Sequence, residues 1–123
     1  MKKFRFLDWK VYKDSQILFS DVLVITNKIP RQYKYDLGSQ IIRSSFSIIL
    51  NISEGSDKTS EKELNRFLDI SLGSAYETLA AAHTFYKNDI ILKKDFDVLY
   101  RRISEICDQL GGFKKRVMDT SKC

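Results

Sequence analysis

The residue types that usually carry catalysis or bind metals are few in this sequence, and they lie far apart. His83 is the sole histidine, and no second ligand stands three or four positions away, the spacing that places two metal ligands on one helix face. Glu61 and Glu63 stand where a helix is expected to begin, and the helix dipole alone favours carboxylates there. Cys107 and Cys123 fit neither a zinc site nor a disulfide framework. We therefore predict no catalytic residue, metal site, cofactor or small-molecule substrate, and a protein that is not an enzyme.

Binding to a polyanion is the chemistry that the composition favours. The chain has 21 Lys and Arg against 16 Asp and Glu, which gives a formal net charge of +5. Residues 1–35 and 93–123 are net positive, whereas residues 36–92 are net negative. Such cations contact phosphates, with steep salt dependence and little sequence preference, although a merely solvated basic face is the alternative. The predicted nucleic-acid-binding residues are Lys2, Lys3, Arg5, Lys10, Lys13, Lys93, Lys94, Arg101, Arg102, Lys114, Lys115 and Arg116.

Aromatic residues are interleaved with these charges. Aromatic rings beside cations can stack on unpaired bases, but some of these rings must instead belong to the core or to an interface. They are Phe4, Phe6, Trp9, Tyr12 and Tyr100.

A row of polar residues follows one side of a predicted helix at spacings of three and four. Three interpretations stay open for it: an exposed polar flank, a partly buried interhelical network with Arg43 paired to Glu77 or Asp69, or a row that binds a ligand. An arginine suits a network because its planar fork satisfies several acceptors. The row is Gln40, Arg43, Ser47, Asn51 and Glu54, and the helix expected to face it offers Arg66, Asp69, Gly73, Ser74 and Glu77.

Apolar residues recur at alternating spacings of three and four, which predicts helices over about 6–29, 33–54, 60–88 and 93–118. Pro30 should end the first helix. We expect Gly55 to end the second in a left-handed conformation, and Ser60 with Glu63 to cap the third. Gly111 and Gly112 disfavour a helix, yet the apolar period of the fourth segment continues through them.

Four long helices with short connections predict an all-α protein, an antiparallel up-down-up-down four-helix bundle forming a single domain over residues 1–123. The second and third helices can be paired so that Ile48 faces Leu68 and Ser45 faces Ser71, with Gly73 allowing a close approach. No apolar run is long enough to cross a bilayer. With no start-of-chain signal sequence either, we expect a cytoplasmic protein without a membrane partner.

The first two helices carry more apolar residues than one core stripe can hold. Soluble proteins rarely expose a large apolar patch, so we expect a neighbouring subunit to cover the surplus. The predicted oligomer interface is Trp9, Tyr12, Phe19, Leu23, Ile42, Phe46 and Ile49.

Two signatures stand out in the sequence: Gln40-Ile41-Ile42-Arg43-Ser44-Ser45 with Asn51-Ile52-Ser53-Glu54-Gly55, and the later Gly73-Ser74 with Glu77. With these signatures the sequence resembles a known family, the bacterial four-helix bundle proteins known as 23S rRNA intervening-sequence proteins, to which accessory proteins of diversity-generating retroelements are similar. The resemblance covers nearly the whole chain, and it departs from the family pattern at Tyr33 and at Gly111-Gly112. It implies a four-helix bundle that assembles into a ring-like homopentamer with a suspected role in nucleic-acid binding. The positions that carry it are Gln40, Arg43, Asn51, Glu54, Gly55, Gly73, Ser74 and Glu77.

Together these patterns predict a non-enzymatic, homo-oligomeric adaptor that binds RNA or DNA through a basic surface. The alternative is a protein–protein interaction scaffold without nucleic-acid binding, in which the basic charge only maintains solubility.

Overall fold

The structure is a computed structural model, which describes the backbone of residues 3–122 and the side chains of residues 3–113. Over that range it is all-helical, without a strand. The elements in chain order are the 3-10 helix η1 (Arg5–Asp8) and the α-helices α1 (Lys10–Asn27), α2 (Arg31–Lys34), α3 (Asp36–Ser56), α4 (Glu61–Lys87) and α5 (Lys93–Lys122).

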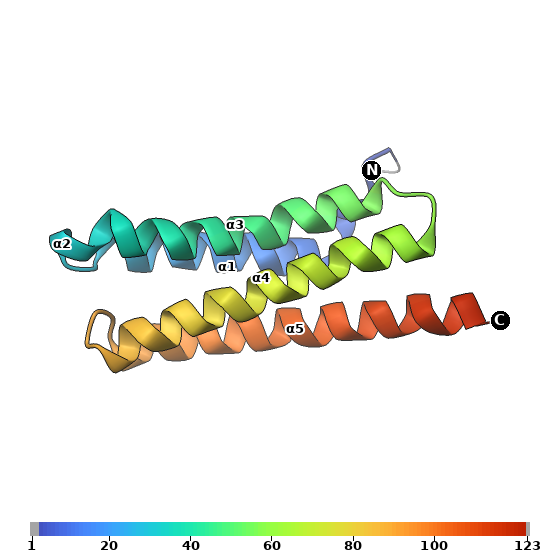
Figure 1. Cartoon of the computed structure of the whole chain (residues 1–123). Coiled ribbons are helices and arrows are strands. Elements are labelled where there is room, and N and C mark those ends of the chain that lie inside the picture. Colours follow the sequence, from blue (N-terminus) through green and yellow to red (C-terminus); the bar gives the residue numbers. More distant parts are fainter. Residues whose placement is uncertain (1–2, 123) are drawn as a thin grey trace.

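Four of these helices are long, and each of them packs against two others. α1 contacts α3 and α5, and α4 also contacts α3 and α5. Chain direction alternates from each long helix to the next, and α1 with α3 lies above α4 with α5 (Figure 1). The beginning of α1 and the end of α5 therefore lie at the same end of the molecule, opposite to α2 and the α4–α5 turn (Figure 1).

The core is built from the aliphatic residues whose spacing predicted the helices. One stripe of each long helix faces inward, because side chains three and four positions apart share a face. Burying one such side chain fully contributes about 1.5–3 kcal/mol. The fully buried positions include Leu18, Val22, Ile41, Ile48, Ile52, Leu68, Leu99, Ile103, Ile106 and Leu110. No helix in the described part of the chain has the length and apolar content needed to span a bilayer.

Two predicted helix boundaries are confirmed. α1 ends at Asn27, and Pro30 adopts an extended conformation (ψ 142°) immediately before α2. The Ser60 hydroxyl accepts a hydrogen bond of 3.0 Å from the backbone N–H of Glu63, and so caps α4. The Glu63 carboxylate accepts from Arg66 instead of from the cap residue, so only half of the expected capping box forms.

The start of the first helix was predicted too early. α1 begins at Lys10, and Trp9 is extended (φ −72°, ψ 135°) between α1 and η1. The rings of Phe6 and Tyr12 meet edge to face at 5.0 Å. The Arg5 guanidinium donates a 3.0 Å hydrogen bond to the Ser56 carbonyl oxygen. These contacts hold η1 across the end of α3. If α1 continued through residues 5–8, those residues would not reach this position.

Two expectations about glycine are wrong. Gly55 does not end α3 in a left-handed conformation, because α3 continues to Ser56 and no described glycine has a positive φ. A Cβ added at Gly55 would lie 2.9 Å from Phe67 Cβ, so this glycine allows α4 to pass close to α3. Gly73 does not serve that purpose, since it is exposed with nothing within 4 Å of an added Cβ.

Candidate functional site

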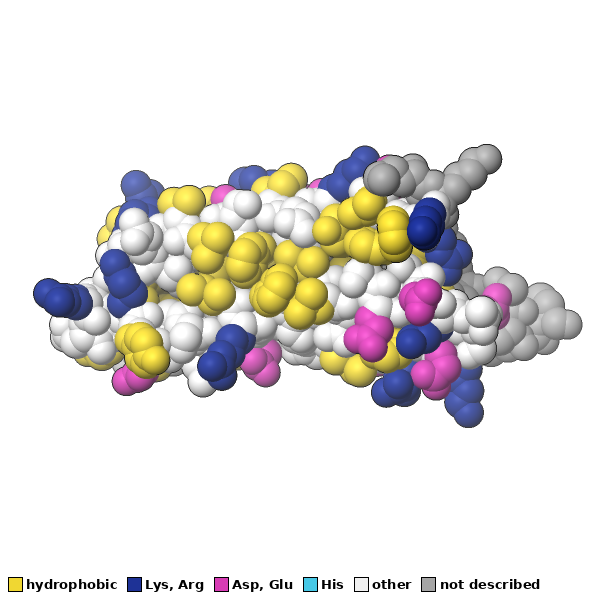
Figure 2. Space-filling view, turned by 90° about the horizontal axis from the view of Figure 1, so that it is seen from above, with side chains coloured by type: hydrophobic (Ala, Val, Ile, Leu, Met, Phe, Trp, Pro, Cys, Tyr) yellow, Lys and Arg dark blue, Asp and Glu magenta, His cyan; other side chains and the backbone are white. Residues whose placement is uncertain are grey.

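An exposed apolar surface runs along α1 and α3. We define the α1–α3 apolar surface as Phe19 and Leu23 of α1 with Phe46 and Leu50 of α3. Leu23, Phe46 and Leu50 are 44%, 45% and 47% exposed, and the rings of Phe19 and Phe46 touch across the two helices with centroids 5.5 Å apart. Figure 2 shows a band of hydrophobic side chains on this face. Hydrophobic side chains that gather in this way mark an interaction surface.

The predicted interface residues divide between this surface and the interior. Leu23 and Phe46 are exposed, whereas Phe19 and Ile42 are partly buried. The expectation that Ile49 lies on an outer face is wrong, because the chain itself buries it to 4% exposure. Sequence reasoning missed Leu50, although it follows the predicted Phe46 by one helical turn.

The other two predicted interface residues are partly buried by contacts within the chain. Trp9 meets Phe113 of α5 with ring centroids 5.1 Å apart, and Tyr12 meets Phe6. Neither belongs to the α1–α3 apolar surface.

The structure does not gather the predicted nucleic-acid-binding residues into one patch. Lys93 and Lys94 begin α5, at the end of the molecule opposite to Lys10 and Lys13 at the start of α1 (Figure 1). Arg101 and Arg102 lie about two turns further along α5 than Lys94. Lys2, Lys114, Lys115 and Arg116 lie outside the described side chains.

Four of the predicted nucleic-acid-binding residues already have hydrogen-bond or ion-pair partners within the chain. Arg5 donates to the Ser56 carbonyl oxygen, as described above. Lys10 and Lys93 form ion pairs of 2.6 and 2.9 Å with Asp14 and Asp97, each one turn further along its own helix. Arg102 pairs with Asp21 at 3.0 Å and so joins α5 to α1. Exposed Lys3, Lys13, Lys94 and Arg101 form no ion pair within the described part of the chain.

The excess positive charge belongs to the chain ends. Residues 3–113 contain 16 basic and 15 acidic side chains, whereas residues 1–2 and 114–123 together contain five basic and one acidic. Basic residues of α5 follow Phe113 directly, at the end of the molecule where α1 begins (Figure 1).

The polar row on α3 separates into exposed and interhelical members. Gln40, Arg43 and Glu54 are exposed, and no ion pair joins Arg43 to a described residue. Glu77 of α4 is exposed as well. The expected network centred on Arg43 therefore does not form, and this side of the row is an exposed flank.

Hydroxyl groups make the interhelical network instead. Thr78 Oγ1 lies 2.8 Å from Ser44 Oγ, and Ser74 Oγ lies 2.9 Å from Ser47 Oγ. The Ser71 hydroxyl donates to the Ile48 carbonyl oxygen at 2.9 Å. This hydroxyl ladder, defined by these three contacts, joins α3 to α4 through hydroxyl groups that are buried or partly buried, as buried polar groups usually require hydrogen-bond partners.

The hydroxyl ladder also corrects the predicted register. The expected alignment placed Leu72 opposite Ser44, whereas the structure places Thr78 there. Ser45 and Ser71 are both fully buried, but Ser45 donates within α3, to the Ile41 carbonyl oxygen. The register is therefore displaced by one to two helical turns along α4.

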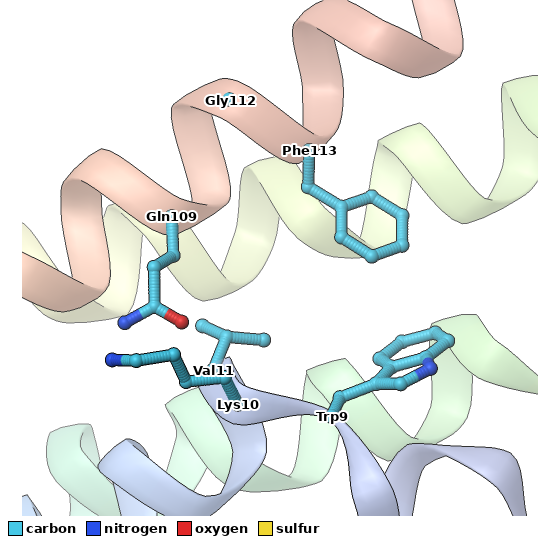
Figure 3. A pocket seen from close by; sticks show the side chains of 6 residues that line it. All are labelled: Trp9, Lys10, Val11, Gln109, Gly112 and Phe113. Carbon is cyan, nitrogen blue, oxygen red and sulfur yellow. The ribbon is translucent and has the colours of Figure 1, made fainter.

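A pocket of about 440 Å³ opens between the start of α1 and the end of α5 (Figure 3). The rings of Trp9 and Phe113 form one wall at an interplanar angle of 48°. Val11 and the backbone of Gly112 line the interior, and nothing lies within 4 Å of a Cβ added at Gly112. Sequence reasoning treated Gly112 only as a weak point in a helix, because the α1 residues opposite it are distant in sequence.

The polar edge of this pocket is fixed by one carboxylate. Asp14 Oδ2 accepts hydrogen bonds from Lys10 Nζ at 2.6 Å and from Gln109 Nε2 at 2.7 Å. Partial burial opposes ionisation of Asp14, but these two hydrogen bonds outweigh it and hold the pKa of Asp14 below its ordinary value. Lys10 and Gln109 therefore have defined orientations at the pocket edge.

Residues with catalytic potential stay apart in the described structure. His83 is exposed on α4, with its ring centroid 5.6 Å from that of Phe96. Burial raises the pKa of the Cys107 thiol, and the nearby Asp108 carboxylate adds to that shift. Within residues 3–113, no three His, Cys, Asp or Glu side chains are grouped as metal ligands would be.

Comparison with known proteins finds a solved structure and a protein family that match this chain. A similar solved structure is a Bacteroides thetaiotaomicron protein of unknown function from the S23 ribosomal protein family. It is 23% identical, with a TM-score of 0.79 over 85% of this chain and 98% of that chain, and at this identity the likeness shows the fold alone. No curated protein matches the chain. The 23S rRNA-intervening sequence protein family matches residues 7–112. The chain therefore belongs to the family of 23S rRNA-intervening sequence proteins.

Proposed function

We propose that this protein is a non-enzymatic, cytoplasmic, homo-oligomeric protein, in which antiparallel four-helix bundles associate through the α1–α3 apolar surface. The observation that carries the proposal is that Leu23, Phe46 and Leu50 are each close to half exposed on two helices joined by the Phe19–Phe46 ring contact. Covering these side chains with a neighbouring subunit removes apolar area from water, at about 25 cal/mol per Å². The family resemblance implies a pentamer, and we adopt that number as part of the proposal.

A charged residue placed on the surface tests this function. Phe46→Glu would place a carboxylate in the centre of the interface, where burial of an unpaired charge is strongly unfavourable. We expect multi-angle light scattering to report a smaller species for Phe46→Glu than for the parent chain at the same concentration.

The matched control is Val24→Glu, because Val24 is 62% exposed on α1 but lies outside the α1–α3 apolar surface. Val24→Glu should leave the mass unchanged. If both variants keep the parent mass, association does not use this surface.

Nucleic-acid binding is a second candidate function, favoured by the excess of basic over acidic residues at the two chain ends. Subunits in an oligomer would each contribute these ends, and avidity would multiply weak phosphate contacts. We expect labelled RNA and DNA to bind at low salt and to dissociate as salt rises. A titration at two salt concentrations separates this candidate from a protein–protein scaffold, because a scaffold shows no binding even at low salt.

A further inference from the structure

The pocket at the α1–α5 junction is lined by the residue that directly precedes a basic stretch of the sequence. Phe113 contributes to its wall, and Lys114, Lys115 and Arg116 follow in the sequence. Gly111 and Gly112 are unfavourable inside a helix, yet α5 continues through both. Gly112 is exposed at the pocket lining, with nothing within 4 Å of a Cβ added there.

The pocket presents two aromatic rings, tilted by 48° to each other, beside one hydrogen-bond acceptor. Donation from Gln109 Nε2 to Asp14 fixes the amide of Gln109. In Figure 3 the nitrogen of Gln109 lies on the side of Lys10 and its oxygen on the side of Val11, a pocket-lining residue. This oxygen accepts no hydrogen bond from a described side chain or backbone group. A ligand that matches this pocket is planar, stacks on aromatic rings and carries an N–H donor at its edge.

We infer that the pocket formed by Trp9, Val11, Gln109, Gly112 and Phe113 binds one unpaired nucleobase that carries an exocyclic amino group. The base lies against the Trp9–Phe113 wall over the Gly112 backbone and donates from its amino group to Gln109 Oε1. Bases of single strands are commonly bound by such stacking, with cations nearby for the phosphates. The inference rests on the nucleic-acid candidate above and gives it a defined site.

The acceptor at the pocket edge predicts a preference among bases. Adenine offers an amino group to Gln109 Oε1. Uracil flanks its ring N–H with two carbonyl oxygens, which that acceptor repels. We therefore expect AMP to bind at least about fivefold more tightly than UMP, since an unpaired acceptor discriminates by at least that much. Ribose 5-phosphate, which has no base, should not enter the pocket.

Trp9 is the only tryptophan of the chain, so its indole N–H gives a single NMR resonance that reports on the pocket. AMP, UMP and ribose 5-phosphate are titrated separately into the full chain. We expect a saturable shift of this resonance with AMP, a weaker response with UMP and none with ribose 5-phosphate. The absence of a shift with millimolar AMP, or an equal shift with ribose 5-phosphate, overturns the inference.

Glycine variants separate the pocket from effects on folding. Gly112→Leu adds a large side chain at the pocket lining, and we expect it to abolish the AMP shift while melting no lower than the parent, because leucine favours the helix. Gly111→Leu is the matched control: it is also exposed with open space at its Cβ but does not line the pocket, and it should bind AMP normally. Phe113→Ala should weaken AMP binding about tenfold, the effect expected for one lost stacking contact.

A labelled single-stranded oligoadenylate identifies the source of the base. If Gly112→Leu weakens strand binding about tenfold, the base belongs to a nucleic-acid strand. If AMP binds but the strand does not, the pocket takes a free nucleotide, and the inference stands without the nucleic-acid function. If the strand binds both proteins equally and AMP gives no shift, the pocket inference fails while the nucleic-acid candidate survives. If neither AMP nor the strand binds, both the pocket inference and the nucleic-acid candidate fail.

Discussion

The α3–α4 and α1–α5 contacts bring pairs of helices together in different ways. Between α3 and α4 the contact is close and filled: Gly55 leaves room for Phe67, and the hydroxyl ladder satisfies buried polar groups. Between α1 and α5 the contact is partly open, because a pocket of about 440 Å³ lies between the start of α1 and the end of α5. Partly exposed pairs such as Arg102 with Asp21 bridge the two helices there.

This difference shows that glycine can have different structural roles at two helix contacts. The missing side chain of Gly55 lets two helices approach each other, whereas Gly112 is exposed at the edge of a pocket, with open space where a side chain would begin. A protein that only needed a stable core would fill the second site, since alanine is favoured over glycine in a helix by about 1 kcal/mol. Variants at the two contacts can test this distinction.

The largest contrast is expected between alanine substitutions at the two glycines. Gly55→Ala should destabilise the protein by about 1–3 kcal/mol, because the new methyl group overlaps Phe67 and the helices must move apart. Gly112→Ala should stabilise it by about 1 kcal/mol, because its methyl group meets nothing. Denaturant unfolding measures both, and equal effects of the same sign would remove the distinction between the two contacts.

The hydroxyl ladder should be the next most sensitive feature. Thr78→Val keeps the side-chain shape but removes the contact to the buried Ser44 hydroxyl, and we expect a loss of about 1–2 kcal/mol. Ser44→Ala combined with Thr78→Val should be less damaging than the two single effects added together, because each single variant already loses the one contact that the two hydroxyls share. A strictly additive double-mutant cycle would show that the two hydroxyls do not interact.

A smaller and pH-dependent effect is expected at the α1–α5 contact. The pKa of Asp14 is lower in the folded state than its ordinary value of 3.8, so its ionised form contributes stability above that pH and loses it as the pH falls through the folded pKa. Asp14→Asn should therefore reduce stability near neutral pH by less than about 1 kcal/mol. The two proteins should converge in acid. Melting curves at several pH values measure the difference, and a gap that stays constant into acid would contradict this assignment.

The smallest effect is expected at Arg43, on the exposed flank of the α3–α4 contact. Arg43 forms no ion pair with a described residue, so Arg43→Ala should change the free energy of unfolding by less than about 0.5 kcal/mol. Thermal unfolding checks this directly. A loss of about 2 kcal/mol or more, on the order expected for breaking a buried network, would place Arg43 in such a network after all.

Most of the helical structure could be predicted because the relevant signals are local. Spacings of three and four placed core residues such as Leu18, Ile48 and Leu99 correctly, and Pro30 and Ser60 marked helix boundaries by their own backbone and side-chain chemistry. The α3–α4 register could not be predicted in the same way. Both helices repeat apolar residues every three or four positions, so several alignments place apolar groups together, and the hydroxyl pairs distinguish them only in three dimensions.

The features of the candidate sites depended on contacts between distant parts of the chain. The η1 segment is held by Arg5 against the end of α3, and no local pattern contains that contact. Gly55 could have been a helix end or a close approach, and only the position of Phe67 decides between them. The pocket forms because the start of α1 lies beside Gly112 near the end of the chain. Residues so far apart in the sequence share no local period, so no spacing pattern could indicate that they meet.

The most direct test of the central claim, association through the α1–α3 apolar surface, is the mass of the unmodified chain in solution. Sedimentation equilibrium at micromolar concentration should show a species several times the 14.4 kDa of one chain, and five times that mass if the pentamer holds. A dimer or tetramer would keep the exposed-surface argument and discard that number. A single species of 14.4 kDa would contradict the account.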